Sequence, residues 1–140
     1  MRDIKLRERR DFELFRAYQK ALKENDFSDQ REAVDYVRKH EAPRWFVSKE
    51  HCAAVISSWL RGKDFFKMRS NKLRKFRALY DLYIKMRPQF PYCAMNHLDL
   101  CAALVDMPAP EWYIDHQMAS RIITEQMAIR NEQIASRYGR

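Results

Sequence analysis

A seven-residue pattern that occurs twice constrains the fold of this chain more than any other feature. The pattern reads Ala-Pro-x-Trp, then an aromatic residue, an aliphatic residue and a Ser or Asp, and it occupies 42–48 and 109–115. Its proline excludes a continuing helix, and its last residue is a favourable N-cap for a new one. Each occurrence therefore predicts an extended connection between two helices.

The similarity extends beyond the two connections. A Leu-aromatic-x-x-Tyr motif occurs at 14–18 and again at 79–83, which is nearly the same offset along the chain. We therefore interpret residues 10–61 and 74–128 as two diverged copies of one unit, made of helix, helix, extended segment and helix. The chain has 140 residues, so both copies are expected to share a single domain, 1–140.

The apolar spacing predicts an all-α fold with about six helices. Apolar residues recur every three or four positions in six segments: 4–24, 29–38, 48–61, 70–86, 93–106 and 115–137. Ser70 is expected to cap the fourth helix, and Gly62 to end the third, in which Trp59 and Leu60 are expected on the buried face. The chain has only 2 Gly, which argues against a hairpin-rich β fold.

Positive charge is concentrated in one stretch of the chain. The net charge is +8, and residues 63–90 contribute most of it, with nine Lys or Arg against two Asp. A local field of this kind attracts phosphate or another anionic surface more effectively than evenly spread charge. The stretch therefore indicates an anionic partner, and double-stranded DNA is the leading candidate.

The first copy also has the outline of a helix-turn-helix, in which one helix braces a second that enters the major groove. Residues 33–38 would form the brace and 48–61 the reading helix, although the connection is longer than the usual three or four residues. The predicted outward face of the reading helix is small and polar, which suits contact with base edges. We therefore predict a helix-turn-helix-like protein that binds DNA or assists at DNA.

The predicted nucleic-acid-binding residues fall into two groups. Basic residues around the start of the fourth helix would contact phosphates and position the protein: Lys67, Arg69, Lys72, Arg74, Lys75 and Arg77. Residues near the end of the third helix would approach the bases: Ser57, Ser58 and Arg61. The alternative interpretation is that both groups form only a solvated polar surface.

A second interpretation of the whole chain is a protein–protein interaction module. The basic stretch would then bind an acidic protein, and the second copy, whose surroundings are net negative, would contact a protein partner or complete the scaffold. Trp45 and Trp112 also have two interpretations. Each indole would fill the core of its own three-helix copy, or it would stack on a ligand.

No catalytic, cofactor or metal-binding motif emerges, so we expect a non-enzymatic protein without a cofactor. Cys93, His97 and Cys101 recur every four residues on one predicted helix, but such positions span about 12 Å, which is too far for one tetrahedral ion, and no second ligand pair is evident. Core packing explains these residues better. The N-terminal sequence lacks the apolar region of a signal peptide, and no apolar run suits a membrane span. We expect a cytoplasmic protein without a membrane partner.

The repeated Ala-Pro-x-Trp-[Phe/Tyr]-[Val/Ile]-[Ser/Asp] pattern, with a basic stretch between its two copies, resembles that of small uncharacterised bacterial all-helical proteins. This group has no established activity. The resemblance covers most of the chain, agrees with an all-helical fold and transfers no functional residue.

Overall fold

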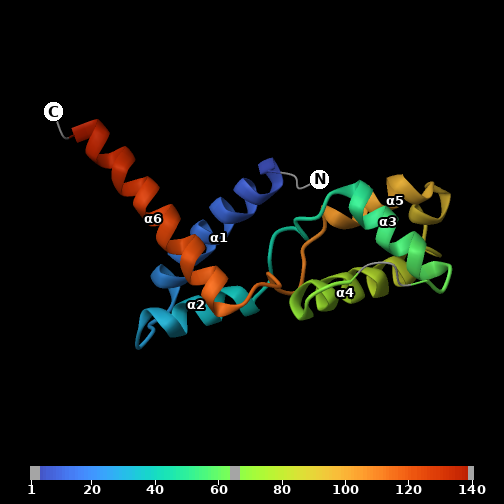
Figure 1. Ribbon diagram of the computed structural model, residues 1–140, viewed down its shortest axis with the longest axis horizontal. Coiled ribbons are helices and arrows are strands. Elements are labelled where there is room, and N and C mark those ends of the chain that lie inside the picture. The colour runs from blue at the N-terminus through green and yellow to red at the C-terminus, as the bar shows by residue number, and fades with distance from the viewer. Residues whose placement is uncertain (1–3, 64–66, 139–140) are drawn as a thin grey trace. The chain divides into compact units, whose positions relative to one another are not determined.

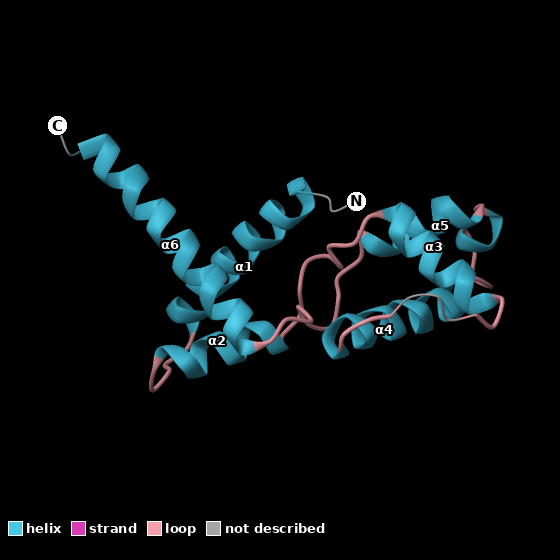
Figure 2. Cartoon of the chain, in the orientation of Figure 1, coloured by secondary structure: helices cyan, strands magenta, loops and turns pink. Residues whose placement is uncertain are grey.

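The computed structural model describes residues 4–63 and 67–138 (Figure 1). Within these ranges the chain forms only helices joined by loops, without a strand (Figure 2). The α-helices are α1 (Ile4–Glu24), α2 (Gln30–Lys39), α3 (Lys49–Leu60), α4 (Ser70–Met86), α5 (His97–Val105) and α6 (His116–Tyr138). The predicted all-α fold is confirmed. None of the described helices combines the length and the apolar character that crossing a membrane requires.

Short polar side chains start several helices at the places that the sequence indicates. Asp29, Ser48 and Asp115 each accept a hydrogen bond from the amide three residues later, at the starts of α2, α3 and α6. These bonds satisfy amides that have no partner within the helix. Gly62 follows α3 with a φ of 73°, a conformation that suits glycine at the end of a helix.

Two helix starts differ from the prediction. α4 begins at Ser70 itself, and its N-cap residue is Arg69, which makes no side-chain capping bond. The predicted cap at Ser70 is therefore wrong. α5 begins only at His97, because the side chain of Asn96 accepts the capping bond there, while Cys93 lies in a preceding 3-10 helix, η1 (Tyr92–Ala94). Cys93 therefore does not continue one helix face with His97, which removes the geometry behind the metal-site alternative.

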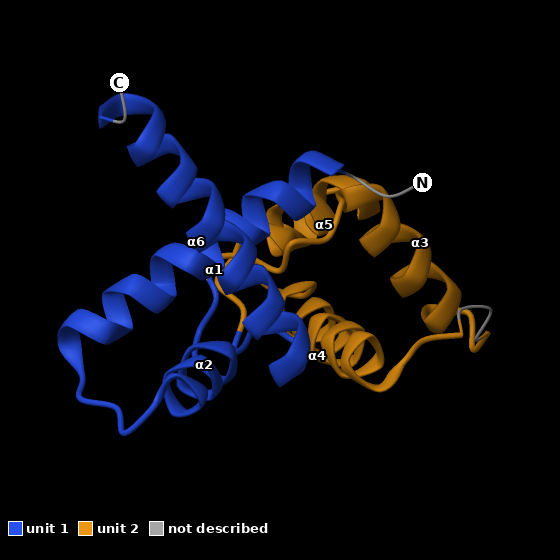
Figure 3. Cartoon of the chain, turned by 60° about the vertical axis from the view of Figure 1, so that its left-hand side comes forward, with its two compact units in different colours: residues 1–42, 110–140 blue, residues 43–109 orange. Residues whose placement is uncertain are grey.

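The chain divides into two compact units (Figure 3). Unit 1 consists of 1–42 and 110–140, and in it α1, α2 and α6 pack against one another. Unit 2 consists of 43–109, and in it α3, α4 and α5 pack against one another. The two predicted copies, 10–61 and 74–128, cut across these units. The third helix of each copy packs against the first two helices of the other copy.

In each extended connection, the backbone amide of the tryptophan donates a hydrogen bond to a carbonyl oxygen at the end of a short helix. In unit 2 the amide of Trp45 donates to the carbonyl oxygen of Val105, the last residue of α5, over 3.2 Å. In unit 1 the amide of Trp112 donates to the carbonyl oxygen of Arg38, near the end of α2, over 3.1 Å. The two donor residues, Trp45 and Trp112, are as far apart in the sequence as the two acceptor residues, Arg38 and Val105. Each connection therefore contacts the short helix of the other copy in the same way.

The backbone also bends in the same way after each tryptophan. Phe46 has a φ of 55° and Tyr113 a φ of 57°, in the left-handed region that residues other than glycine rarely adopt. Trp45 and Trp112 are each only 4% exposed, so the predicted burial of both side chains is confirmed. The expected location is wrong, because each tryptophan lies in the unit that contains the first two helices of the other copy.

One residue of the predicted core of α3 faces solvent instead. Cys52, Val55 and Ile56 are fully buried, but Leu60 is 47% exposed and Trp59 is half-buried. Ser58 is the fourth buried residue of this helix. A buried hydroxyl is tolerated there because it has a hydrogen-bond acceptor, the carbonyl oxygen of Lys63.

Candidate nucleic-acid interface

The basic residues predicted to bind phosphate all lie in unit 2, on the first turns of α4 and in the segment before it. We call this set the basic surface. Its members are Lys67, Arg69, Lys72, Arg74, Lys75 and Arg77. All are exposed except Lys75, which is half-buried. Their charges therefore face water over most of the first two turns of α4.

The start of α4 differs from the starts of α2 and α5. Arg69, the N-cap residue of α4, makes no side-chain capping bond, and the first turn contains no acidic residue. α2 and α5, in contrast, each have a capping side chain and an acidic residue in the first turn. The free amides and the dipole at a helix N-terminus favour an anion. At α4 the surrounding cations add to this preference.

The basic surface borders α3 at His51. The rings of His51 and Phe76 lie 5.0 Å apart, centroid to centroid. Burial lowers the pKa of His51, and the neighbouring charges of Lys72 and Lys75 lower it further. His51 is therefore neutral near pH 7 and adds no charge to the surface.

The basic surface also borders a pocket of about 380 Å³, which we call the aromatic pocket. Its lining residues come from the end of α3, the turn after it, and α4: Trp59, Gly62, Lys63, Leu73, Arg77, Tyr80 and Asp81. Trp59 and Tyr80 meet edge to face with their ring centroids 5.7 Å apart. Sequence reasoning placed Trp59 in the core and missed this pocket. The aromatic residue beside the basic stretch was the available signal.

The three residues predicted to approach the bases do not share one exposed face. Arg61 is exposed and Ser57 is half-buried. Ser58 is 2% exposed, and its hydroxyl donates to the carbonyl oxygen of Lys63 over 3.0 Å. The amide of Lys63 donates in return to the carbonyl oxygen of Ser58 over 3.0 Å. The predicted outward orientation of Ser58 is therefore wrong, because the turn after α3 uses its hydroxyl.

The predicted brace and reading helix belong to different units. α2 packs against α1 and α6, whereas α3 packs against α5 and α4. The helix-turn-helix arrangement remains a prediction. The residues that unit 2 itself brings together are those of α4 and of the end of α3.

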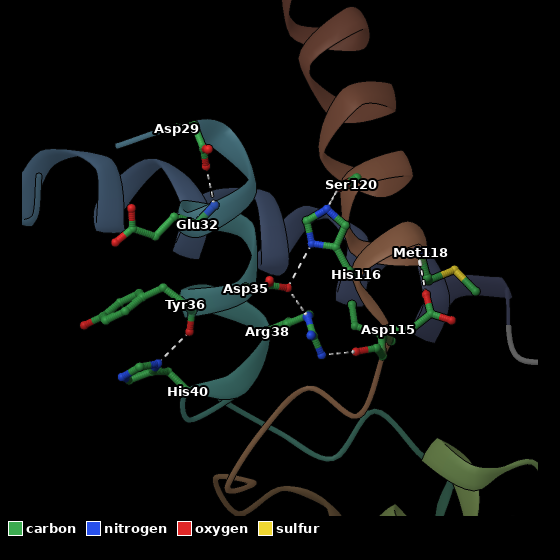
Figure 4. A network of polar contacts seen from close by, with 11 residues as sticks. Asp29, Glu32, Asp35, Tyr36, Arg38, His40, Asp115, His116, Met118 and Ser120 are labelled. Atoms are coloured by element: carbon green, nitrogen blue, oxygen red, sulfur yellow. Dashed lines mark hydrogen bonds and ion pairs between the residues drawn. The ribbon is translucent and has the colours of Figure 1, made fainter. Parts of the chain in front are cut away.

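A second polar cluster, which no sequence motif indicated, lies in unit 1 (Figure 4). The Asp35 carboxylate of α2 accepts hydrogen bonds from Arg38 Nε over 2.6 Å and from His116 Nδ1 of α6 over 2.8 Å. His116 Nε2 lies 3.2 Å from Ser120 Oγ. The bonds from Arg38 and His116 lower the pKa of Asp35 to about 2. Asp35 and His116 are far apart in the sequence, so no motif could have connected them.

This serine–histidine–aspartate order resembles that of a hydrolytic triad, but its setting differs. Acyl transfer also needs hydrogen-bond donors aimed at the developing oxyanion. Ser120 lies one turn inside α6, where its backbone amide is used within the helix. We therefore interpret the cluster as a polar contact that joins α2 to α6.

Two buried cysteines lie between α3 and α5 in unit 2. Cys52 and Cys101 are both fully buried free thiols. The hydrogen bond between them raises the pKa of Cys52 and lowers the pKa of Cys101. Among the described residues, no group of three or more His, Cys, Asp or Glu side chains could hold a metal ion. The pair is explained by helix packing.

The chain matches no protein-family model, no curated protein and no solved structure. What it binds therefore has to be inferred from the chemistry of its own residues.

Proposed function

We propose that the protein binds double-stranded DNA through the basic surface, with the first turns of α4 against the phosphate backbone. One observation carries the proposal: six cationic residues lie on the first turns of α4 and in the segment 67–69 before it, at a helix start where Arg69 makes no side-chain capping bond and the first turn contains no acidic residue. Helix N-termini are established phosphate-binding positions. The arrangement at α4 favours a polyanion over a single acidic side chain, because several cations can each contact a different phosphate.

Such contacts position a protein on DNA without selecting a sequence. Each phosphate that Lys or Arg neutralises releases condensed counterions, which favours binding at low salt. Arg61 is exposed and Ser57 is half-buried near the end of α3, and they are the described residues we propose for contact with bases. Ser58 is not proposed, because it is buried.

A salt titration with a short duplex of random sequence tests this function. We expect binding that weakens steeply with salt, with a log–log slope of about −0.9 for each phosphate contacted. Fluorescence anisotropy of a labelled duplex measures both the affinity and the slope. Absence of binding at low salt would contradict the proposal and favour a protein as the partner of the basic surface.

An observation in unit 1 favours a second candidate function, a protein–protein contact through α6. The second half of α6, from Met127 to Tyr138, is exposed throughout. Met127, Ile134 and Tyr138 recur at helical spacing and are 37%, 42% and 75% exposed. A partner that covers this face would exclude water from it. Sedimentation over a range of concentrations, for the parent and for Ile134→Glu, would reveal whether a second copy is that partner.

A further inference from the structure

The aromatic pocket combines three kinds of group at the border of the basic surface. Trp59 and Tyr80 provide flat apolar surface, Lys63 and Arg77 provide cations, and Asp81 provides a carboxylate acceptor. Its volume of about 380 Å³ lies at the small end of the range for ligand sites. A site of this size and composition suits one flat heterocycle that carries N–H donors and is attached to an anionic chain.

We propose that the aromatic pocket takes one unpaired nucleobase of the DNA strand whose phosphates lie on the basic surface. This inference rests on the proposed function and adds a ligand feature to it. The base would stack on the half-buried aromatic side chains, as bases do in single-strand binding sites. Lys63 and Arg77 would contact the phosphates on either side of that nucleotide.

The carboxylate of Asp81 indicates that the base enters the pocket and that its phosphate stays outside. A phosphate close to Asp81 would be repelled, whereas the N–H groups of a base edge would find an acceptor there. Leu73 adds apolar surface to the lining. A free inorganic phosphate is therefore a poor occupant, and a nucleobase is a good one.

The turn after α3 forms part of the pocket lining, and its backbone is hydrogen-bonded. The two reciprocal hydrogen bonds between Ser58 and Lys63 hold the turn after α3. Gly62 forms part of the lining, and a Cβ added there would lie more than 4 Å from the atoms of the described residues around it.

Helix packing alone does not require the aromatic residue. Trp59 stands eleven residues after the N-cap of α3, and Gln126 stands eleven residues after the N-cap of α6. Both helices pack in units of the same kind, so a polar residue suffices at this place in α6. Trp59 packs edge to face on Tyr80, and the part of its ring that stays exposed is available for stacking with a base.

A comparison of three DNA duplexes tests the inference on the full chain. The first is fully paired, the second carries one unpaired base, and the third carries an abasic unit at the same place. We expect the parent to bind the second duplex at least about fivefold more tightly than the other two, which is the lower end of the range for one stacked base. Trp59→Leu should lose this preference and still bind the paired duplex. The matched control Trp59→Phe, which keeps a ring, should retain most of it.

A second readout does not depend on loss of binding. Addition of the duplex with the unpaired base should quench the fluorescence of the parent, because a stacked base lies against Trp59, and the abasic duplex should quench far less. Trp45 and Trp112 are buried, so Trp59→Phe should abolish the difference. If the parent binds the unpaired-base and abasic duplexes equally, the inference is wrong while the proposed function stands. If no duplex binds at low salt, both fail together.

Discussion

The backbone amide of Trp112 donates a hydrogen bond of 3.1 Å to the carbonyl oxygen of Arg38, which lies in the first half of the chain. Likewise, the backbone amide of Trp45, in the first half of the chain, donates a hydrogen bond to the carbonyl oxygen of Val105 in the second half. As a result, neither predicted copy contains a complete unit. Unit 2 alone is continuous along the chain, from 43 to 109.

The third helix of each copy packs with the first two helices of the other copy, and we call this arrangement the exchange. It predicts which fragments of the chain fold. The fragment 43–109 contains α3, α4 and α5 together, so we expect it to be helical and to unfold cooperatively on heating. The fragment 1–62 corresponds to the first copy and contains α1 and α2 without α6, and α3 without its partners. We expect it to aggregate, because its apolar faces stay uncovered. Circular dichroism with temperature measures both. A cooperative 1–62 beside an unfolded 43–109 would contradict the exchange.

The two buried tryptophans should contribute strongly to stability. Trp45→Ala and Trp112→Ala each empty a core site, and we expect each to lower the free energy of unfolding by about 3–5 kcal/mol. Trp59→Ala is the matched control, and its half-buried ring should make its cost clearly smaller. Urea unfolding measures all three. An equal loss of unfolding free energy at the three positions would contradict the expectation that the loss follows side-chain burial.

The Asp35 cluster predicts how stability depends on pH. Bonds from Arg38 and His116 lower the pKa of Asp35 from 3.8 to about 2. A carboxyl group whose pKa is lower in the folded than in the unfolded protein stabilises the fold at pH values above its ordinary pKa. This stabilisation is lost as the pH falls through the pKa of the folded state. Asp35→Asn should therefore remove about 1 kcal/mol at neutral pH, a figure reduced for the partial exposure of the side chain. The difference from the parent should shrink between pH 4 and pH 2.

Unfolding of the parent and Asp35→Asn at several pH values checks this expectation. Asp26→Asn, which also replaces one carboxylate but at an exposed loop position, is the matched control. A constant difference between the parent and Asp35→Asn down to pH 2 would mean that the carboxylate is not the stabilising species.

Ser58 should matter for the turn after α3 and not for base contact. Ser58→Ala removes the donor to the Lys63 carbonyl and should cost about 1 kcal/mol of stability. It should leave the sequence preference of DNA binding unchanged, since the hydroxyl is buried. Ser57→Ala, one residue earlier, should cost less. A shift in sequence preference for Ser58→Ala alone would contradict the structure of this turn.

Local features of the fold could be predicted from the sequence, because local interactions determine them. The capping side chains of Asp29, Ser48 and Asp115 lie just before α2, α3 and α6, as the residue types indicated. α4 was located despite the wrong cap at Ser70, because its apolar spacing is long and regular. The concentration of basic residues on α4 was likewise visible in the sequence.

The nonlocal features could not be predicted in this way. An apolar helix face can pack against either copy, so spacing could not show that α6 joins α1 and α2. The contact of Asp35 with His116 depends on that packing. Spacing also could not separate Trp59, which lines a pocket, from Trp45, which is buried. Trp59 lies in the last turn of α3, at a position where the apolar spacing predicts burial, and Trp45 lies in the extended connection before that helix.

The slope of the DNA affinity against salt, compared between two variants of equal net charge, tests the proposed function most directly. One variant replaces Lys72, Arg74, Lys75 and Arg77 of the basic surface with Gln. The matched control replaces four exposed cations of α1 with Gln: Lys5, Arg7, Arg9 and Lys20.

If the basic surface holds the phosphates, the first variant should flatten the log–log slope by up to about 3–4, since each lost contact removes about 0.9. Its affinity should fall by a similar factor for every duplex sequence. The control should keep nearly the slope of the parent. Equal slopes for the parent and the first variant, or equal losses in the two variants, would contradict DNA binding through α4.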